Sequence, residues 1–414
     1  MSEKKKKGTP LWQISKKFNF AAEKIIPDSF VFCVVLTLVV AVLSLVVCHI
    51  TPINLLTSWW DGLSSQFTLA FQMGLMVVVC ATCARSPQVS KLLDGLAGLV
   101  HTRTAALVLL MAFGYVSSML NWAFCTIVTP ILAMQLAKRV KGLHFPMMVA
   151  GGYCCMILGQ CLGPSATLYS NLATEGSNYA EIVGQTMTVA ETCYNPVNVV
   201  LWVILAVCFI VLVLFTQPGD NELVELRNIA TQADVAPKDY QSHDKAQTPA
   251  EKMNTCKPIM WVVGAAIFIY IIYSIATKGF FATLNMNMVI FMFVGINCFL
   301  FPQPHSWMEA HTDSMHLATD VILQFPFYGA IMGMMYVEGG LGSVIVNAIV
   351  SVATAETMPV FSFLSASVVN LFIPSQGGQF TVQGPLIVQA AQSIPGTNLV
   401  NCLNGFVFGD ECTN

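Results

Sequence analysis

The run SASVVNLFIPSQGGQFTVQGP, residues 365–385, decides how the rest of this sequence is interpreted. It lies within a strongly apolar region, yet it contains amide and hydroxyl side chains and is interrupted by proline and glycine. In lipid every free backbone N–H or C=O needs a partner, so such a segment is stable only against protein or a water-filled cavity. Transporters use broken segments of this kind near mid-membrane to hold substrate and coupling ion. The alternative is a loop outside the membrane that joins two spanning helices.

Composition places the whole chain in a membrane. Of its 414 residues, 55% are hydrophobic and only 10% are charged, with a mean hydropathy of +0.67. Soluble proteins have about 25% charged residues, so we expect an all-α polytopic membrane protein. No Lys or Arg follows Lys278, and the net charge is −3, which gives nucleic acid no basic surface to bind. The 14 cysteines lie mostly in apolar runs without nearby His, so we expect no metal site and no cofactor.

The distribution of charge divides the chain into four parts. Residues 1–28 are basic and are expected to stay cytoplasmic, while residues 29–216 form a first membrane repeat with a leading helix. Residues 217–257 are polar and read as a cytoplasmic linker, for which we prefer a disordered loop. Residues 258–414 form a second membrane repeat. Apolar runs at 30–50, 67–84, 258–277 and 284–301 are each long enough to span a bilayer of about 30 Å.

Residues 104–137 carry no charge over a length that is too long for one helix and too short for two helices with a loop. We therefore expect a re-entrant hairpin that breaks at residues 117–122. Lys138 and Arg139 follow the run and return the chain to the cytoplasmic side. A further helix at residues 320–336 is expected to kink near Pro326.

Short similar sequences in the two halves suggest that the halves are related. Ser118 and Asn121 are spaced like Ser367 and Asn370, FQMGLM (71–76) resembles FYGAIM (327–332), and ETCYN (191–195) resembles ECTN (411–414). Their common order predicts two inverted repeats with about 9–11 transmembrane or re-entrant segments. An apolar helix is expected after ETCYN (191–195) in the first half, but nothing follows ECTN (411–414) in the second half. We therefore expect the second repeat to lack its last helix.

Several motifs resemble those of bacterial short-chain fatty acid transporters. They are QFPFYG (324–329), NLFIPSQGG (370–378), VQGP (382–385), FGD (408–410) and the pair NW (121–122). The resemblance implies a permease for short monocarboxylates such as acetoacetate and butyrate in the bacterial inner membrane, with inverted repeats and re-entrant hairpins. It also implies a homodimer, by analogy. Gln376 stands where the family usually has Gly, and Gln379 where His is frequent, which bears on substrate choice.

A carboxylate in this region must be bound without a buried cation, because no Lys or Arg lies in a membrane span of the second half. Helix N-termini, backbone N–H groups and amide or hydroxyl side chains supply the donors instead. We expect the substrate-binding residues to be Ser375, Gln376, Gly377, Gly378, Gln379, Thr381, Gln383, Ser118 and Trp122. Asn121 and Asn370, at equivalent hairpin tips, are the candidates for binding a cation such as Na⁺.

Each of these residues also has a structural alternative. The two asparagines could cap broken helices, and Gln383 could form only interhelical hydrogen bonds. Asp320 and Glu338 are acids near spans that we place in water at an interface.

The sequence predicts a secondary active transporter that couples carboxylate movement to Na⁺ or H⁺ by alternating access. A permease for dicarboxylates or amino-acid conjugates, or a carboxylate channel, remains open as an alternative. An enzyme would need a convergent nucleophile, base or metal cluster, and the sequence contains none.

Overall fold

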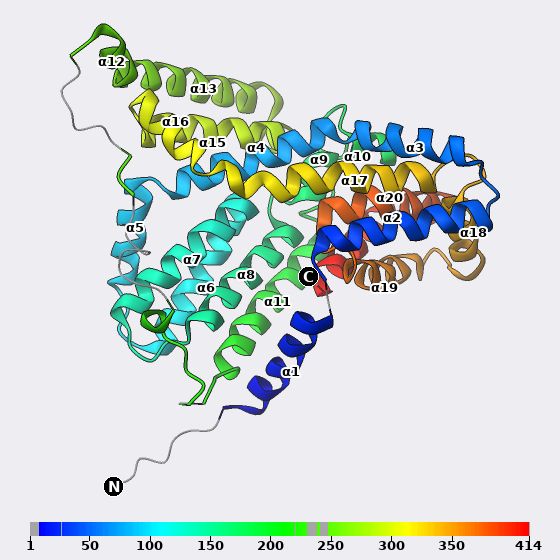
Figure 1. Cartoon of the computed structure of the whole chain (residues 1–414), viewed down its shortest axis with the longest axis horizontal. Helices are drawn as coiled ribbons and strands as arrows, with labels where there is room; N and C mark the ends of the chain where they lie inside the picture. The colour runs from blue at the N-terminus through cyan, green and yellow to red at the C-terminus, as the bar shows by residue number, and fades with distance from the viewer. Residues whose placement is uncertain (1–7, 26, 220, 230–237, 241–246, 414) are drawn as a thin grey trace.

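The computed structural model describes residues 8–25, 27–219, 221–229, 238–240 and 247–413 (Figure 1). Within these ranges the secondary structure is entirely helical. Among the described residues, seven helical stretches are long and apolar enough to cross a membrane by length and composition. The expected all-α polytopic membrane protein is thus confirmed, while the division into inverted repeats stays a prediction.

The described helices of the first half lie between residues 10 and 215. They are α1 (Pro10–Ile25), α2 (Ser29–Val46), α3 (Pro52–Ser65), α4 (Phe67–Ala84), α5 (Pro87–Ala97), α6 (Arg103–Leu120), α7 (Trp122–Arg139), α8 (Phe145–Leu162), α9 (Thr167–Leu172), α10 (Asn178–Val183) and α11 (Pro196–Phe215). The linker contains the 3₁₀ turn η1 (Leu226–Asn228) and α12 (Pro249–Asn254).

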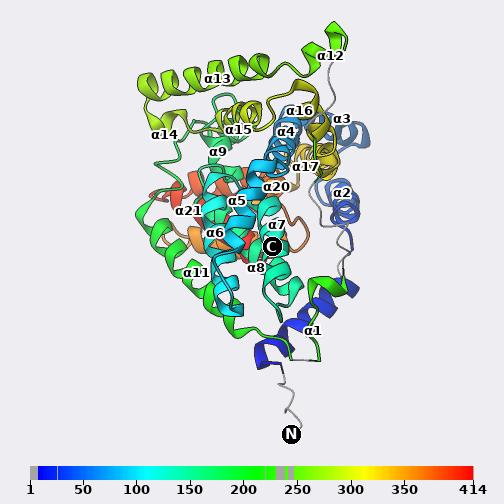
Figure 2. The ribbon, with the colours of Figure 1, turned by 90° about the vertical axis from the view of Figure 1, so that its left-hand side faces the viewer.

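The helices of the second half begin at residue 257. They are α13 (Lys257–Lys278), α14 (Phe280–Thr283), α15 (Met286–Leu300), α16 (Pro304–Thr312), the 3₁₀ turn η2 (Met315–Ala318), α17 (Thr319–Met335), α18 (Leu341–Val352), α19 (Met358–Asn370), α20 (Gln376–Ser393) and α21 (Leu399–Thr413). α13 lies along an outer edge of the molecule in both views (Figure 2).

A hairpin interrupts the uncharged run of the first half where the sequence predicts it. Between α6 and α7 a single residue, Asn121, is extended at φ −164° and ψ 136°. Its side-chain Oδ1 accepts hydrogen bonds from the N–H groups of Ala123 (2.8 Å) and Phe124 (3.1 Å). Asn121 thus ends one helix and caps the next, because its side chain replaces the partners that the first N–H groups of α7 lack.

The second hairpin joins α19 to α20, and here the structure corrects one detail. Residues 371–375 form the break, and Ser375 is the N-cap, with its Oγ accepting the Gly378 N–H. Gly384 and Pro385, read from the sequence as further interruptions, lie inside α20. Gly384 is needed for packing, since a Cβ there would lie 2.8 Å from the Phe380 ring. All residues from 376 to 388 are buried, so α20 is the central helix of the second half.

The two hairpins lie on opposite sides of the molecule. Figure 1 shows α6 and α7 in its left-hand part and α19 and α20 in its right-hand part, with α8 between them. α8 packs against α6, α7 and α11 in its own half and against α21 in the other half. The end of α8 is therefore one place where the halves meet, beside the packing of α17 against α2, α3 and α4.

Glycines allow the closest helix contacts. Gly405 and Gly409, four residues apart on α21, face the backbone of α19, and a Cβ at Gly409 would lie 2.1 Å from the Phe363 carbonyl oxygen. Gly329 and Gly333 of α17 face α3 in the same way. Such small-residue pairs are typical of membrane helices, where packing replaces the hydrophobic effect as the main attraction between helices.

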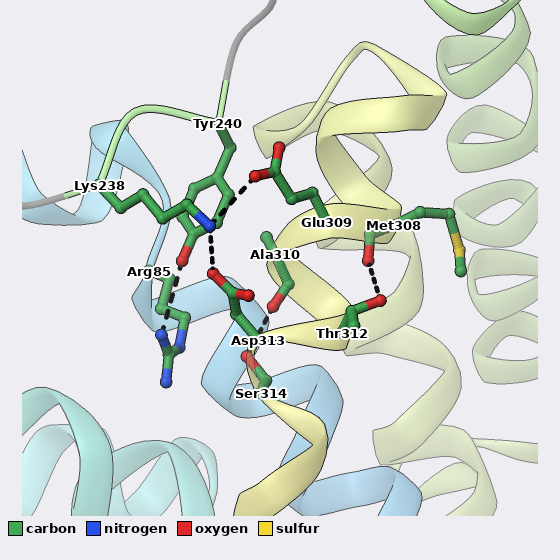
Figure 3. Close-up of polar contacts among 9 residues, drawn as sticks. All are labelled: Arg85, Lys238, Tyr240, Met308, Glu309, Ala310, Thr312, Asp313 and Ser314. Carbon is green, nitrogen blue, oxygen red and sulfur yellow. Dashed lines mark hydrogen bonds and ion pairs between the residues drawn. The ribbon is translucent and has the colours of Figure 1, made fainter.

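The linker is not a free loop in its described residues, contrary to our expectation. Lys238 Nζ lies 2.7 Å from Asp313 Oδ2 and 3.1 Å from Glu309 Oε1 at α16 (Figure 3). Tyr240 is buried against Phe301, which explains why a polar segment is held here. The hydrogen bond from Lys238 holds the pKa of Asp313 below its ordinary value.

The beginning of the linker forms a second anchor, which we call the N-terminal latch. Trp12 Nε1 of α1 donates a hydrogen bond to Glu222 (2.6 Å), and Lys16 pairs with the same carboxylate (2.5 Å). The Val224 N–H donates to Nδ1 of His144 (2.9 Å), the residue before α8. The latch therefore ties α1 and the linker to the start of α8.

The latch should open as the pH falls. Nδ1 of His144 can accept the Val224 N–H only in the neutral imidazole, and burial, followed by the positive charge of Arg103, lowers the pKa of His144. A lowered folded-state pKa means that this stabilisation is complete above the ordinary histidine pKa of about 6.5 and is lost as the pH falls below it. Amide hydrogen exchange of residues 221–229, corrected for intrinsic rates, should accelerate between pH 7.5 and 5.5.

The variant His144→Gln is the matched control, because a Gln side-chain oxygen accepts the same hydrogen bond at every pH. Its exchange protection should not change between the two pH values. Equal pH dependence in wild type and variant would contradict the role given to His144.

Candidate functional site

The candidate site is built around the last turn of α8, which ends inside the protein. The chain leaves the helix at Leu162, crosses residues 163–166 and resumes as α9 at Thr167. The carbonyl of Gly159 accepts the Gly163 N–H (2.7 Å). The next carbonyls accept from side chains: Gln160 from Gln376 Nε2, Cys161 from Asn198 Nδ2 and Leu162 from Cys193 Sγ. A helix end far from water is thus satisfied by protein groups, as burial requires.

Gln376, the first residue of α20, connects three other helices. Its Nε2 donates to the Gln160 carbonyl (3.3 Å) and to Glu411 Oε1 of α21 (3.1 Å), and its Oε1 accepts the Leu168 N–H of α9 (2.9 Å). The side chain is 3% exposed. Gln376 is therefore the central hydrogen-bonding group of the site.

Two acids lie beside Gln376 near the end of α21. Asp410 is 0% exposed and Glu411 is 5% exposed. Asn370 Nδ2, at the end of α19, donates to Asp410 Oδ1 (2.8 Å). The residues that the structure describes include no buried Lys or Arg. Burial disfavours the charged form of a carboxyl group, so a proton or a metal cation would stabilise this pair.

Ser118 approaches the same turn of α8 from the first hairpin. It is fully buried, and a Cβ on Gly159 would lie 2.5 Å from the Ser118 Cβ. Ser118 and Gln376 therefore contact one helical turn, although they come from different hairpins. This is the pair of predicted site residues that the structure brings together most directly.

The first turn of α20 is closely packed. The Gly377 carbonyl accepts hydrogen bonds from Tyr179 OH (2.5 Å) and Thr381 Oγ1 (2.9 Å). A Cβ at Gly378 would lie 2.4 Å from the Tyr328 ring. Both glycines let neighbouring side chains reach the backbone, which larger residues would prevent.

Gln379 and Gln383 turn toward α19 instead. Gln379 Nε2 donates to the Ala366 carbonyl (2.8 Å) and to Gln383 Oε1 (2.9 Å), and Gln383 Nε2 donates to Ser365 Oγ (2.9 Å). These bonds hold the two arms of the second hairpin together. The structural alternative given for Gln383, an interhelical hydrogen bond, therefore describes its contact with Ser365.

The structure does not bring Asn121 and Asn370 to common partners. Asn121 contacts α4, with its Nδ2 3.2 Å from Met76 Sδ and its Oδ1 accepting from the Cys80 thiol. Asn370 contacts α21 through Asp410 and Thr413. Trp122 is half-buried at the start of α7, and its indole N–H has no hydrogen-bond partner among the described residues.

Sequence reasoning missed four residues of this site: Gln160, Tyr179, Asp410 and Glu411. A signal for the acids was present, because they directly follow the apolar run at 399–408, and ionisable groups inside membrane segments indicate function. Asp320 and Glu338, which we weighed instead, are exposed. Their place in water at an interface stays a prediction.

Two interrupted hairpins that converge on a broken helix are the architecture of a helical membrane transporter. A solved structure shares this fold. The chain is similar to the YdaH transporter of Alcanivorax borkumensis, with a TM-score of 0.51. The crystal structure of that transporter is described as having an unusual topology. The match covers 93% of this chain and 86% of that chain at 16% identity, which shows a common fold.

The sequence comparisons identify the family. The family described as "Short chain fatty acid transporter" matches residues 11–414, so the chain belongs to it. The chain is 28% identical over 404 residues to an Escherichia coli K12 protein and 27% identical over 411 residues to a Haemophilus influenzae protein. Both are provisionally named short-chain fatty acid transporters, and each match covers 97% of this chain and 90% of the relative. The chain is a transporter-family membrane protein and not an enzyme.

Replacing Gln376 by Leu should destabilise the site. The substitution keeps the size of the side chain but leaves the Leu168 N–H, the Gln160 carbonyl and Glu411 without this partner. Interhelical hydrogen bonds in membranes are worth about 0.6–2 kcal/mol each, so we expect a lower Tm and impaired transport. Thermal unfolding in detergent measures the first effect.

Gln389→Leu is the matched control, because Gln389 lies on the same helix but is exposed. It should leave the Tm unchanged. A Gln376→Leu variant as stable as this control would show that the buried network does not hold α8, α9 and α21 together.

Proposed function

We propose that the protein carries short-chain monocarboxylates such as acetoacetate and butyrate across the bacterial inner membrane by cation symport with alternating access. The observation that carries the proposal is the buried acid pair, Asp410 and Glu411, hydrogen-bonded to both ends of the break in the second hairpin. Family membership supports the substrate class.

The substrate carboxylate would bind at the N-terminus of α20. An 18-residue helix has unpaired N–H groups and a partial positive charge at its start, which suit an anion. Ser375, Gln376 and the backbone of Gly377 and Gly378 lie in this first turn. Ser118 faces the same α8 turn from the other side and completes the proposed binding set.

The negative charges of the substrate and of the two acids favour coupling of transport to a cation. A carboxylate that approaches α20 meets Asp410 and Glu411, and the described residues offer no buried Lys or Arg to balance three negative groups. A bound Na⁺ or H⁺ would reduce this repulsion, so substrate and cation would enter together. Asn370, which already donates to Asp410, would help to hold the cation, while the contacts of Asn121 support a role in shaping the first tip.

The direction of insertion is part of the proposal. Lys16, Lys17 and Lys24 lie on α1, and Arg85, Lys91, Arg103 and Lys138–Lys141 flank the helix ends of the first half. By the positive-inside rule this side, with the N-terminus and the linker, would face the cytoplasm. Assembly as a homodimer, implied by the family resemblance, belongs to the same proposal.

Gradient-driven uptake tests the mechanism. In proteoliposomes we expect labelled acetoacetate and butyrate to accumulate under an inward Na⁺ or proton gradient, after subtraction of leakage into empty liposomes. Asp410→Asn should abolish accumulation yet retain counterflow exchange, because it removes the charge that requires the cation but keeps the size of the side chain.

Glu338→Gln, which neutralises an exposed acid, is the control and should behave as wild type. Uptake that is indifferent to both gradients would refute symport, and loss of counterflow in the wild type would favour a channel. Full gradient-driven accumulation by Asp410→Asn would place the coupling site elsewhere.

A further inference from the structure

A cavity of about 410 Å³ lies away from the α8–α20 site, between α13, α14, α15 and the segment after α9. Its polar lining comes from Lys278, Glu175, Asn285, Asn287 and the hydroxyls of Thr174, Ser274 and Thr283. Tyr270, Met288 and Phe291 provide apolar walls. Small-molecule sites have volumes of about 300–1,000 Å³ and combine apolar walls with a few polar groups, as this cavity does.

Lys278 gives the cavity its chemical character. It is the last Lys or Arg of the chain and lies in the final turn of α13. Among the described residues no carboxylate forms an ion pair with it. An ammonium group in a partly enclosed cavity attracts an anion, and a single positive charge suits a ligand with a single carboxylate.

The two asparagines add donors to this charge. Asn285 Oδ1 accepts the Met288 N–H (3.0 Å), and Asn287 Oδ1 accepts from Gln72 Nε2 (2.8 Å). Both carbonyl oxygens are thereby used in fixing the side chains. The amide NH₂ groups of Asn285 and Asn287 have no hydrogen-bond partner among the described residues, so they are available to a ligand.

α9 connects the cavity to the site. Thr174, in the cavity wall, donates to the Ser170 carbonyl and accepts the Met286 N–H. Thr174 lies two residues beyond the end of α9, and near the start of that short helix the Leu168 N–H donates to Gln376 Oε1. Six residues of helix correspond to about 9 Å. The cavity is therefore one short helix away from the first turn of α20.

We propose that this cavity is a second carboxylate-binding site, which captures the short-chain monocarboxylate before it moves to α20. The inference rests on the proposed function. Glu175, on the wall of the same cavity, weakens the attraction of Lys278 for an anion. Weak binding suits an entry site, because a substrate that is held tightly would not move on.

Initial rates of labelled butyrate uptake by the full-length protein in proteoliposomes test this proposal. Lys278→Gln should raise the KM about threefold to tenfold and leave the maximal rate unchanged, since it removes one charge-assisted contact. Glu175→Gln should change the KM in the opposite direction. Lys257→Gln, at the other end of α13, is the matched control and should have the wild-type KM.

Ala282→Trp tests the cavity without changing its charge. Ala282 is an exposed residue of the cavity wall, so a Trp there can fill the space without disturbing the core. It should also raise the KM. Unchanged KM values for Lys278→Gln and Ala282→Trp would overturn the proposal, as would a fall in maximal rate alone.

A binding measurement separates this proposal from the proposed function. Saturation-transfer NMR of butyrate with the purified protein does not require transport. Weaker transfer in both variants than in Lys257→Gln would support the cavity even if wild-type uptake failed. Transfer equal to that of the control would reject the cavity even if wild-type uptake succeeded.

Discussion

The constraint on which this structure depends is the satisfaction of backbone carbonyls where α8 ends inside the protein. The turn is buried there, so each carbonyl needs a donor from the protein. Asn198 and Cys193 supply two from the first half, and Gln376 supplies one from the second. The same turn that must be satisfied for stability is thus also a contact between the halves, in addition to the packing of α17 against α2, α3 and α4.

That solution uses amides where a soluble protein would often use charges. Gln376 can donate and accept at once, so it connects a carbonyl, an N–H group and a carboxylate in one place. Asp410 and Glu411 are then the main source of charge in the interior. Their partners in the second hairpin, Asn370 and Gln376, are neutral, so the net charge of the interior depends on whether a proton or cation is bound.

The sequence predicts those parts of the fold that follow from length and local chemistry. The hairpin break at Asn121 follows because residues 104–137 are too long for one helix. The capped start of α2 follows from Asp28, whose carboxylate accepts the Phe30 N–H. Gly384 and Pro385 misled us because tertiary packing can keep such residues within a helix. Contacts such as that between Gln160 and Gln376 leave no local pattern, which is why the network around Gln376 and the anchored linker were not predicted.

The long separation of these contacts along the chain has a consequence for biogenesis. Ribosomes release the first half before the second, so the end of α8 first meets Asn198 and Cys193, and Gln376 reaches it only 216 residues after Gln160. The acids of α21 emerge later still. Until then the end of α8 lacks the donor that Gln376 supplies to the Gln160 carbonyl, so this turn is completed only when the second half has been made.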